Sequence, residues 1–582
     1  MMNLKKGAVA VLLLIAGYFA AKSIASYLLV LMLGKGAEPF LVFRYMGYVS
    51  SIPNGYAPLQ EHFWQIIFAG TVSFILTGLI VVPLLKRLLR SAPKSSHGDA
   101  RFATYLELWL AGMFRSSRRG IIVGKKGGRL VRLDGQQFVI LAAPTRSGKG
   151  VSVVVPNLLE YGESIVVLDI KQENFQLTSG WRASQGQKVY LFNPFAEDGK
   201  THRWNPLGLV PEGHDERIAA LMSIAAALYP DASADQKFWV SHARNAFMAF
   251  TLWLFETRAK GVDDGVSPGA CVAPTLGAVY RLSSGNGSDL KNHFQRMSLT
   301  PGLSANARSA FANLLSQEKE TFSSIMGSFQ EPLNAWINPT LDAATSCNDF
   351  DLRDVRKQKM TIYIGIQPNK LAESRLIVNL FFSQLIQENT RTLPQNDSDL
   401  KYQCMLLMDE FTAIGKVEII SSAIAYIAGY NLRLVPVIQS MSQLNAVYGH
   451  ENARTIITNH ALQIIFAPRE QQDAVEYSDM LGYQTVKREQ VTRGHKRRDV
   501  SRSVGDEKRA LLLPQELKAL GPNKEIFMYE GLPHPVKCSK IRYYKQRRFR
   551  KRLLPAVDIA AVKVAATPKA PPARSPDQKP CA

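Results

Sequence analysis

Two long apolar runs lie within the first ninety residues of the chain. Val9 to Leu33 is interrupted by a single charge, Lys22, and Phe63 to Leu85 carries none. Each run is long enough to cross a bilayer as a helix, which takes about 20 residues. Residues 1–90 are therefore predicted to be a transmembrane anchor with spans at about 9–33 and 63–85. A cleavable signal peptide at the N-terminus is the alternative interpretation.

Positive charge flanks the two apolar runs on the same side. Lys5 and Lys6 precede the first run, and four Lys/Arg residues lie within 86–94 after the second. The loop between the runs, residues 34–62, balances two basic residues with two acidic ones. Because cationic flanks stay in the cytoplasm, both termini are predicted to be cytoplasmic. The body from about residue 91 onward is expected to carry the function.

The rest of the chain alternates short apolar runs with amphipathic stretches. Apolar runs of this length, bounded by turn residues, predict buried strands. The predicted strands are 137–142, 164–168, 188–192, 361–366, 404–408, 433–438, 462–466 and 525–529. Their alternation with helices predicts an α/β fold built on a mostly parallel sheet.

The first predicted strand leads into a glycine-containing turn and then an apolar helical stretch. Such a unit surrounds phosphate groups with backbone N–H groups, a lysine and a helix N-terminus. Ala143 stands where the usual pattern has its first Gly, and Gly150 stands where a Ser or Thr would ligate magnesium. An ordinary turn between strand and helix is the alternative. The predicted nucleotide-contacting residues are Pro144, Thr145, Arg146, Ser147, Gly148, Lys149, Gly150 and Val151.

Polar side chains follow three other predicted strands. Asp409 and Glu410 end one of them, an arrangement in which the Asp orients hydrated Mg²⁺ and the Glu polarises the attacking water. Gln439 ends another and is predicted to contact the γ-phosphate or its water, unless it is a solvent-exposed strand end beside a capping Ser440. Asp169 and Lys171 follow the third and are possible site residues, with a salt-bridged turn as the alternative. Lys149, Asp409, Glu410 and Gln439 are the predicted catalytic residues.

A long insertion separates the phosphate loop from the acidic pair. Neighbouring strands do not need so long a connection, so the insertion is predicted to be a separate all-α domain at residues 211–345. Its predicted helices are 215–229, 235–260, 288–298 and 304–336, and their aromatic stripe is interpreted as core. Residues 91–210 and 346–540 are then the two parts of a split nucleotide-binding domain. Residues 541–582 are predicted to be a basic, disordered tail.

The composition adds a strong positive charge to this picture. The 582 residues carry 70 Lys+Arg and 48 Asp+Glu, a formal net charge of +22. Two segments hold much of the excess: Lys487–Arg509 has nine Lys/Arg and four Asp/Glu, and Lys540–Arg552 has eight Lys/Arg and no acid. Nucleic-acid phosphate is the expected partner of these segments, and anionic lipid or another subunit is the alternative. A metalloprotease is unsupported, because the sequence has no HExxH.

Four segments together resemble a known family. Ala-Pro-Thr-Arg-Ser-Gly-Lys-Gly at 143–150, Leu-Asp-Ile-Lys-Gln-Glu-Asn at 168–174, Leu-Leu-Met-Asp-Glu-Phe at 406–411 and Val-Ile-Gln-Ser at 437–440 are similar to the type IV coupling proteins. These are the membrane-anchored ATPases of bacterial conjugation and type IV secretion. The resemblance extends from residue 1 to about 540, and Gly150 is a substitution found in one branch of the family.

The resemblance implies a RecA-like P-loop fold, a homo-hexamer around a channel, and a place in the bacterial inner membrane. It also implies ATP and Mg²⁺ as cofactors, and DNA, a relaxase or effector protein, and components of the secretion channel as partners. Hydrolysis at subunit interfaces requires a trans arginine, for which Arg433, Arg375 and Arg469 are the candidates. Two other functions remain open at this point: an effector receptor that uses ATP as an assembly switch, and a septal-type chromosomal DNA translocase.

Overall fold

The computed structural model describes residues 2–32, 62–89, 96–231, 234–261, 274–285, 289–493 and 500–563. The chain separates into two compact units, Met1–Ser96 and His97–Ala582. Most of the predicted loop between the two apolar runs lies outside the described residues.

The N-terminal unit consists of two long helices, α1 (Met2–Met32) and α4 (Phe63–Leu89). They pack against each other through a small apolar cluster that includes Ala25 and Ala69. Most of their other large apolar side chains are exposed. Both helices contain a stretch long and apolar enough to cross a membrane, with mean hydropathies of 1.9 and 2.3. This composition is consistent with membrane anchoring.

Lys22, the single charge within the first apolar run, lies beside aromatic rings. Its ammonium group is 5.4 Å from the ring centroid of Tyr18 and 5.9 Å from that of Phe74 on the other helix. A ring face attracts a cation and lowers the cost of keeping it in an apolar environment. The helix pair thus accommodates the residue that interrupts the first predicted span.

The second unit is built on one eleven-stranded sheet with the order β2-β1-β13-β12-β9-β3-β8-β7-β4-β6-β5. The strands from β9 to β5 pair in parallel, as predicted. They are β9 (Leu462–Ile465), β3 (Val139–Ala142), β8 (Leu432–Ile438), β7 (Cys404–Met408), β4 (Ser164–Ile170), β6 (Met360–Ile366) and β5 (Lys188–Phe192). Their continuous apolar sequences are explained by burial on both faces of the sheet.

The other end of the sheet is antiparallel, which the apolar pattern of the sequence did not indicate. It contains β12, the predicted strand at 525–529, and three strands that the apolar pattern missed. Their bounds are β12 (Lys524–Tyr529), β13 (Val536–Ser539), β1 (Ile121–Lys126) and β2 (Arg129–Leu133). The fold is therefore a mixed α/β sheet.

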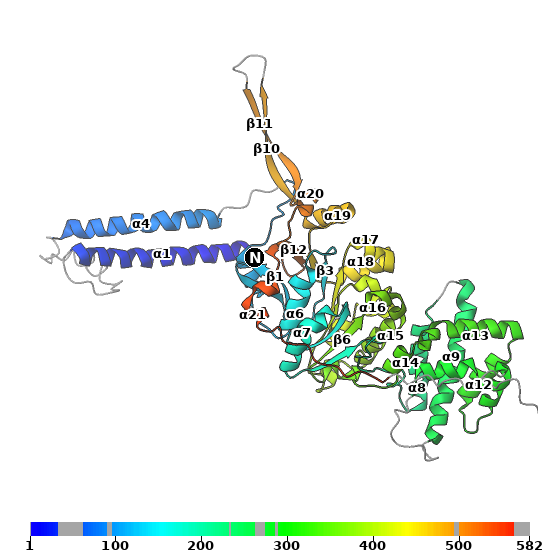
Figure 1. Ribbon diagram of the computed structural model, residues 1–582. Helices are drawn as coiled ribbons and strands as arrows, with labels where there is room; N and C mark the ends of the chain where they lie inside the picture. The colour runs from blue at the N-terminus through cyan, green and yellow to red at the C-terminus, as the bar shows by residue number, and fades with distance from the viewer. Residues whose placement is uncertain are drawn as a thin grey trace, which may run out of the picture. The chain divides into compact units, whose positions relative to one another are not determined.

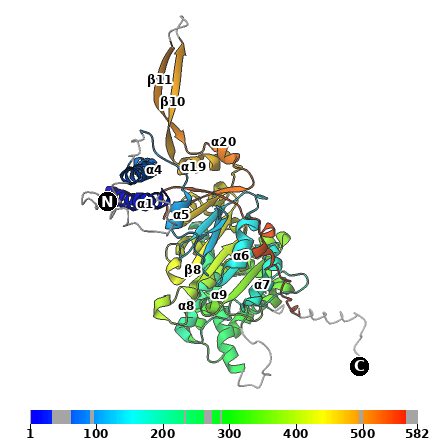
Figure 2. The same ribbon diagram turned by 90° about the vertical axis from the view of Figure 1, so that its left-hand side faces the viewer.

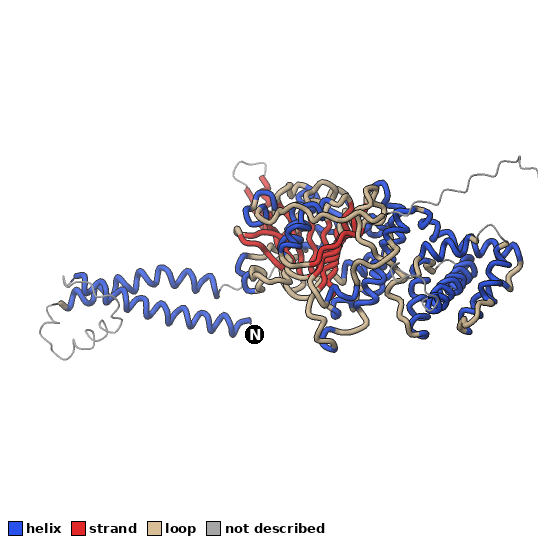
Figure 3. Tube along the Cα trace, turned by 60° about the horizontal axis from the view of Figure 1, so that its bottom comes forward, coloured by secondary structure: helices blue, strands red, loops and turns tan. Residues whose placement is uncertain are grey.

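Helices cover both faces of this sheet, so that the strands form a middle layer (Figure 3). On one face, α6 (Val155–Glu160) and α7 (Glu173–Ser184) lie side by side, as Figure 2 shows. On the other face lies α15 (Leu371–Asn389). Shorter helices complete the unit: α5 (Tyr105–Leu110), α16 (Glu418–Ala423), α17 (Met441–Tyr448), α18 (His450–Thr458), α19 (Gln471–Leu481), α20 (Pro514–Lys518) and α21 (Arg547–Arg550).

A group of helices is inserted between β5 and β6. Its members are α8 (His214–Leu228), α9 (Lys237–Gly261), α10 (Leu276–Ser284), α11 (Leu290–Ser298), α12 (Ala305–Leu315), α13 (Lys319–Leu333) and α14 (Pro339–Ala344). The predicted helical stretch 304–336 is broken after Leu315. Phe250 of α9 is fully buried, with its ring centroid 4.9 Å from that of Phe294, so part of the aromatic stripe is core. Phe238 is 47% exposed and does not belong to that core.

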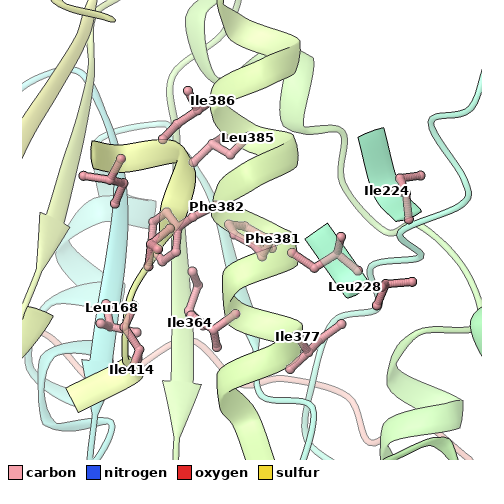
Figure 4. Close-up of a cluster of buried hydrophobic side chains, with 14 of the residues drawn as sticks. Leu168, Ile224, Leu228, Ile364, Ile377, Phe381, Phe382, Leu385, Ile386 and Ile414 are labelled. Atoms are coloured by element: carbon pink, nitrogen blue, oxygen red, sulfur yellow. The ribbon is translucent and has the colours of Figure 1, made fainter. Parts of the chain in front are cut away.

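The inserted helices are joined to the sheet through α15. Ile224 and Leu228 of α8 lie beside Ile377 and Phe381 of α15 in one apolar cluster (Figure 4). The other side of α15 packs over the sheet, where Ile364 of β6 is buried. A single helix thus contacts both the insertion and the sheet.

One basic segment, Lys487–Arg509, forms most of a separate two-stranded ribbon (Figure 1). Its strands are β10 (Tyr483–Arg493) and β11 (Val500–Ala510), paired antiparallel along their full length. On the described part of the ribbon, basic residues of one strand lie beside acidic residues of the other: Lys487 is the cross-strand partner of Asp506, and Arg488 pairs with Glu507 at 3.4 Å. The basic tip, residues 494–499, lies outside the described residues.

The other basic segment differs from the disordered tail predicted at 541–582. From Ile541 to Lys563 the chain folds back over α6 and α7, and residues 564–582 lie outside the described residues. Ile541 and Phe549 are fully buried against Val155 and Leu159. Arg548 pairs with Glu160 at 2.5 Å, and Arg552 pairs with the same carboxylate. Two cations of this segment therefore pair with a carboxylate of α6.

Candidate nucleotide-binding site

The predicted phosphate loop connects β3, in the middle of the sheet, to a helix. Two of its residues have left-handed backbone angles, Arg146 (φ 58°) and Gly148 (φ 88°). Lys149 then returns to right-handed angles, and the chain continues as a π-helical turn, Gly150–Val154, that runs into α6. A left-handed residue followed by a right-handed one brings successive N–H groups to one concave side, where an anion binds. A left-handed backbone is unfavourable for a non-glycine residue, and residues held in it cluster at functional sites.

The loop has open space beside Gly150 and, within the described part of the chain, a buried hydroxyl group without a partner at Ser147. A Cβ placed on Gly150 would meet no atom within 4 Å. The Ser147 Oγ is buried and has no hydrogen-bond partner among the described residues. A buried hydroxyl without a partner is costly, and a phosphate oxygen would satisfy it. The residues present therefore fit a bound phosphate group.

The acidic pair faces the lysine of this loop. The Lys149 ammonium lies 3.1 Å from Asp409 Oδ1 and 3.1 Å from Glu410 Oε1. Asp409 and Glu410 follow β7, and Glu410 has a left-handed backbone (φ 61°). The carboxyl ends of parallel strands meet at one edge of a sheet, which explains how residues 260 positions apart come together.

Gln439 connects the acidic pair to the phosphate loop. Its Nε2 donates to Glu410 Oε2 at 3.2 Å, and its Oε1 accepts a hydrogen bond from Thr145 Oγ1 at 3.1 Å. Ser440 caps α17 by accepting from Gln443 N at 3.1 Å, as the alternative interpretation predicted. The structure brings the four predicted catalytic residues together through contacts of 3.1–3.2 Å.

Asp169 and Lys171 lie at the end of β4 but have other surroundings. The Asp169 carboxylate accepts from Phe175 N at 2.8 Å and Asn174 N at 3.2 Å, so it caps the start of α7. Burial raises the pKa of Asp169 to about 7, and these N–H donors oppose the shift. Lys171 is exposed and has a left-handed backbone (φ 88°). Asp169 thus has a capping role that its position alone did not reveal.

Arg433 is wrong as a candidate for the trans arginine. Its side chain is fully buried and donates to the carbonyl oxygens of Gln137 and Arg119 at 2.7 Å and of Leu133 at 3.1 Å. It lies near the start of β8, six residues and roughly 20 Å of strand from Gln439 at the other end. A neighbouring subunit cannot reach a guanidinium that is enclosed in this way. Arg375 and Arg469 are both exposed.

Lys540, which was not among the predicted site residues, also contacts the phosphate loop. Lys540 Nζ donates to the Ser147 carbonyl oxygen at 3.0 Å, across 393 residues of sequence. It belongs to the basic segment Lys540–Arg552, which was assigned to nucleic acid. No local pattern distinguishes it from its basic neighbours.

A glycine-containing loop with a lysine after one strand, and an acidic pair after a nearby parallel strand, are the arrangement found in P-loop proteins. Over residues 109–566, the chain also matches the family model described as type IV secretory system conjugative DNA transfer. The chain therefore belongs to the family of type IV secretion coupling proteins, which mediate conjugative DNA transfer.

Individual relatives agree with this assignment. The chain is 31% identical over 530 residues to protein VirD4 of Rhizobium radiobacter, covering 89% of this chain and 73% of the relative. It is 27% identical over 506 residues to conjugal transfer protein TraG of Escherichia coli, covering 79% and 77%.

The fold is shared with the conjugative coupling protein TrwB. The unbound structure of TrwBdeltaN70 aligns with a TM-score of 0.56 and 17% identity, covering 81% of this chain and all of that chain. TrwB in complex with ADP and Mg²⁺ aligns with a TM-score of 0.55 and 15% identity, covering 80% and 99%. The expected α/β fold with a helical insertion is confirmed.

Proposed function

We propose that the chain binds ATP with Mg²⁺ at the Lys149 loop and hydrolyses ATP to drive the transfer of DNA–protein substrates. The observation that carries this proposal is the contact of Lys149 with Asp409 and Glu410 at the edge of the sheet. TrwB, whose fold this chain shares, has been solved with ADP and Mg²⁺, which supports the same cofactors here.

Each residue of the cluster has a role in this proposal. The backbone of residues 144–151 surrounds the phosphates, and Lys149 neutralises charge on the β- and γ-phosphates. Asp409 orients hydrated magnesium, which when bound supplies positive charge to the phosphate oxygens. Glu410 polarises the attacking water, and Gln439 positions that water or the γ-phosphate.

The assembly is part of the same proposal. The two apolar helices anchor the chain in the bacterial inner membrane with both termini in the cytoplasm, as the positive flanks favour. A homo-hexamer brings an arginine of one subunit to the phosphates of the next, and exposed Arg375 and Arg469 remain the candidates. The substrate is DNA bound by a relaxase, delivered to components of the secretion channel.

A second candidate function is a receptor for effector proteins in which ATP acts as an assembly switch. The contact that favours it is the position of α15, which packs on α8 of the insertion and on the segment Phe411–Ile414 that directly follows Glu410. A substrate bound to the insertion is thereby connected to the acidic pair through one helix. The family match favours either function over the septal-type translocase.

ATP hydrolysis by the full-length chain in lipid nanodiscs, with and without single-stranded or duplex DNA, separates the two candidates. We expect DNA to stimulate hydrolysis, and Lys149→Ala to abolish hydrolysis and conjugative transfer without affecting membrane insertion. Unchanged transfer by Lys149→Ala would contradict the motor. Hydrolysis that does not respond to DNA would instead support the receptor.

A further inference from the structure

Lys540 follows the antiparallel strand β13 and reaches the phosphate loop from the antiparallel end of the sheet. Its backbone N–H donates to Asn523 O at 2.9 Å, which fixes the start of the side chain. Its ammonium group donates to Ser147 O at 3.0 Å and lies 3.4 Å from the ring centroid of Phe466. A hydrogen bond and a cation–π contact together fix the position of this group.

The groups around Lys540 leave its charge largely uncompensated. The acid whose charge acts on Lys540 is Glu525, which is fully buried and accepts from Cys538 Sγ at 3.5 Å. Its other oxygen has no hydrogen-bond partner among the described residues. Burial raises the pKa of Glu525 to about 8, so this carboxyl group is mostly neutral at pH 7. Burial lowers the pKa of Lys540 to about 8, so the ammonium group still carries its charge at that pH.

The space for the Glu525 side chain depends on a glycine in strand β1. A Cβ placed on Gly124 of β1 would lie 2.5 Å from Glu525 Oε1 and 2.6 Å from Cys538 Sγ. Any larger residue at position 124 would therefore displace the carboxyl group. The result is a cation in contact with the backbone of a loop that is shaped for anions.

We propose that Lys540 is a positioning residue of the nucleotide site. It holds the Ser147 carbonyl oxygen away from the phosphates and adds a second positive charge, besides that of Lys149, at the phosphate loop. A phosphate loop binds anions through N–H groups, so a carbonyl oxygen that rotated into it would repel the ligand. The Lys540 hydrogen bond occupies this oxygen and prevents that rotation. This inference rests on the proposed ATP site and extends it to the C-terminal segment.

A purely structural role for Lys540 would have a different kinetic signature. Loss of packing lowers the melting temperature of the chain but leaves the affinity of the folded molecules for nucleotide unchanged. Loss of a positioning contact weakens binding in both the ground state and the transition state, so KM rises while kcat changes little. A tenfold change in affinity corresponds to about 1.4 kcal/mol.

The test uses the full-length chain in nanodiscs and the variants Lys540→Met, Lys540→Gln and Lys540→Arg. Lys537→Met, which removes an exposed lysine three positions earlier, is the matched control. We measure the Kd of a fluorescent ATP analogue, KM, kcat and the melting temperature. We expect Lys540→Met to raise Kd and KM about tenfold with kcat within about threefold. Lys540→Arg is expected to restore most of the affinity, and the control to match the wild type.

Lys540→Gln keeps a donor for Ser147 without the charge, so it provides a second test if Lys540→Met does not fold. An intermediate Kd for Lys540→Gln agrees with the proposal. Wild-type Kd and KM in a folded Lys540→Met or Lys540→Gln variant would overturn the proposal. Loss of nucleotide binding in Lys149→Ala would show, in that case, that the proposed ATP site is still correct. If the wild type binds no nucleotide, the proposed function fails and this inference fails with it.

Discussion

Replacement of Arg433 by Met tests whether this arginine holds the fold together, as its surroundings indicate. The guanidinium is buried and donates to three backbone carbonyl groups, those of Gln137, Arg119 and Leu133. Each lost charge-assisted bond costs about 1.5–3 kcal/mol and leaves a buried carbonyl oxygen unpaired. Burial lowers the pKa of Arg433 to about 10, so removing the charge recovers roughly 3 kcal/mol of desolvation cost.

The balance of these contributions is a loss of about 3 kcal/mol of folding free energy, within the range for breaking a buried polar network. For a unit of this size, the melting temperature is expected to fall by roughly 3–6 °C. The assay is thermal unfolding of the full-length variant in nanodiscs, followed by ATP hydrolysis in mixed oligomers with Lys149→Ala. If Arg433 were the trans arginine, an Arg433→Met subunit would still have an intact phosphate loop. A Lys149→Ala neighbour would supply the missing arginine, so hydrolysis would be restored at mixed interfaces. An unchanged melting temperature together with restored hydrolysis would refute the structural role.

Three further perturbations follow from the described contacts. The folded chain retains a Glu525 proton that the unfolded chain releases above about pH 4.5. The free energy of unfolding of the wild type, relative to that of Glu525→Gln, should therefore fall by up to about 1.4 kcal/mol per pH unit as the pH rises to about 8. A difference between the two melting curves that does not change with pH would contradict this. In Gly180→Ala, the new Cβ would overlap the Pro555 carbonyl oxygen and push the C-terminal segment away from α7. Trypsin should therefore release this segment faster than from the wild type, as measured by mass spectrometry. The third perturbation changes two exposed residues, Arg547 and Lys551, together to Gln. The slope of log affinity for DNA against log salt concentration should become shallower by up to about 2. An unaltered slope would mean that these residues bind another partner.

The parallel half of the sheet could be predicted from the sequence because its strands are buried on both faces. Such strands are continuous apolar runs, as in Cys404–Met408, whose predicted bounds match the observed ones. The strand Arg129–Leu133 was missed because Arg132 interrupts the pattern. In the structure, Arg132 is buried and pairs with Glu160 at 2.9 Å, a contact that local sequence cannot show.

The candidate site was predictable where its chemistry is local and not where it depends on distant chain segments. Lys149, Asp409 and Gln439 each follow an apolar run, and parallel strand ends meet at one edge of a sheet. Arg433 instead begins the predicted strand 433–438, and its partners are backbone carbonyl groups from distant segments that surround it only in the folded chain. Lys540 lies hundreds of residues from the loop that it contacts, within a segment whose charge suggested another ligand.

The central claim is that Lys149 and Glu410 form a site for ATP hydrolysis, and the variant Glu410→Gln tests it most directly. The measurement compares the Kd for a fluorescent ATP analogue with the rate of ATP hydrolysis, for the full-length wild type, Lys149→Ala and Glu410→Gln. General-base residues contribute about 10²–10⁴-fold to rate. We predict that Glu410→Gln binds nucleotide with near wild-type affinity and hydrolyses it at least about 100-fold more slowly, whereas Lys149→Ala loses both properties. Wild-type hydrolysis by Glu410→Gln would contradict the account.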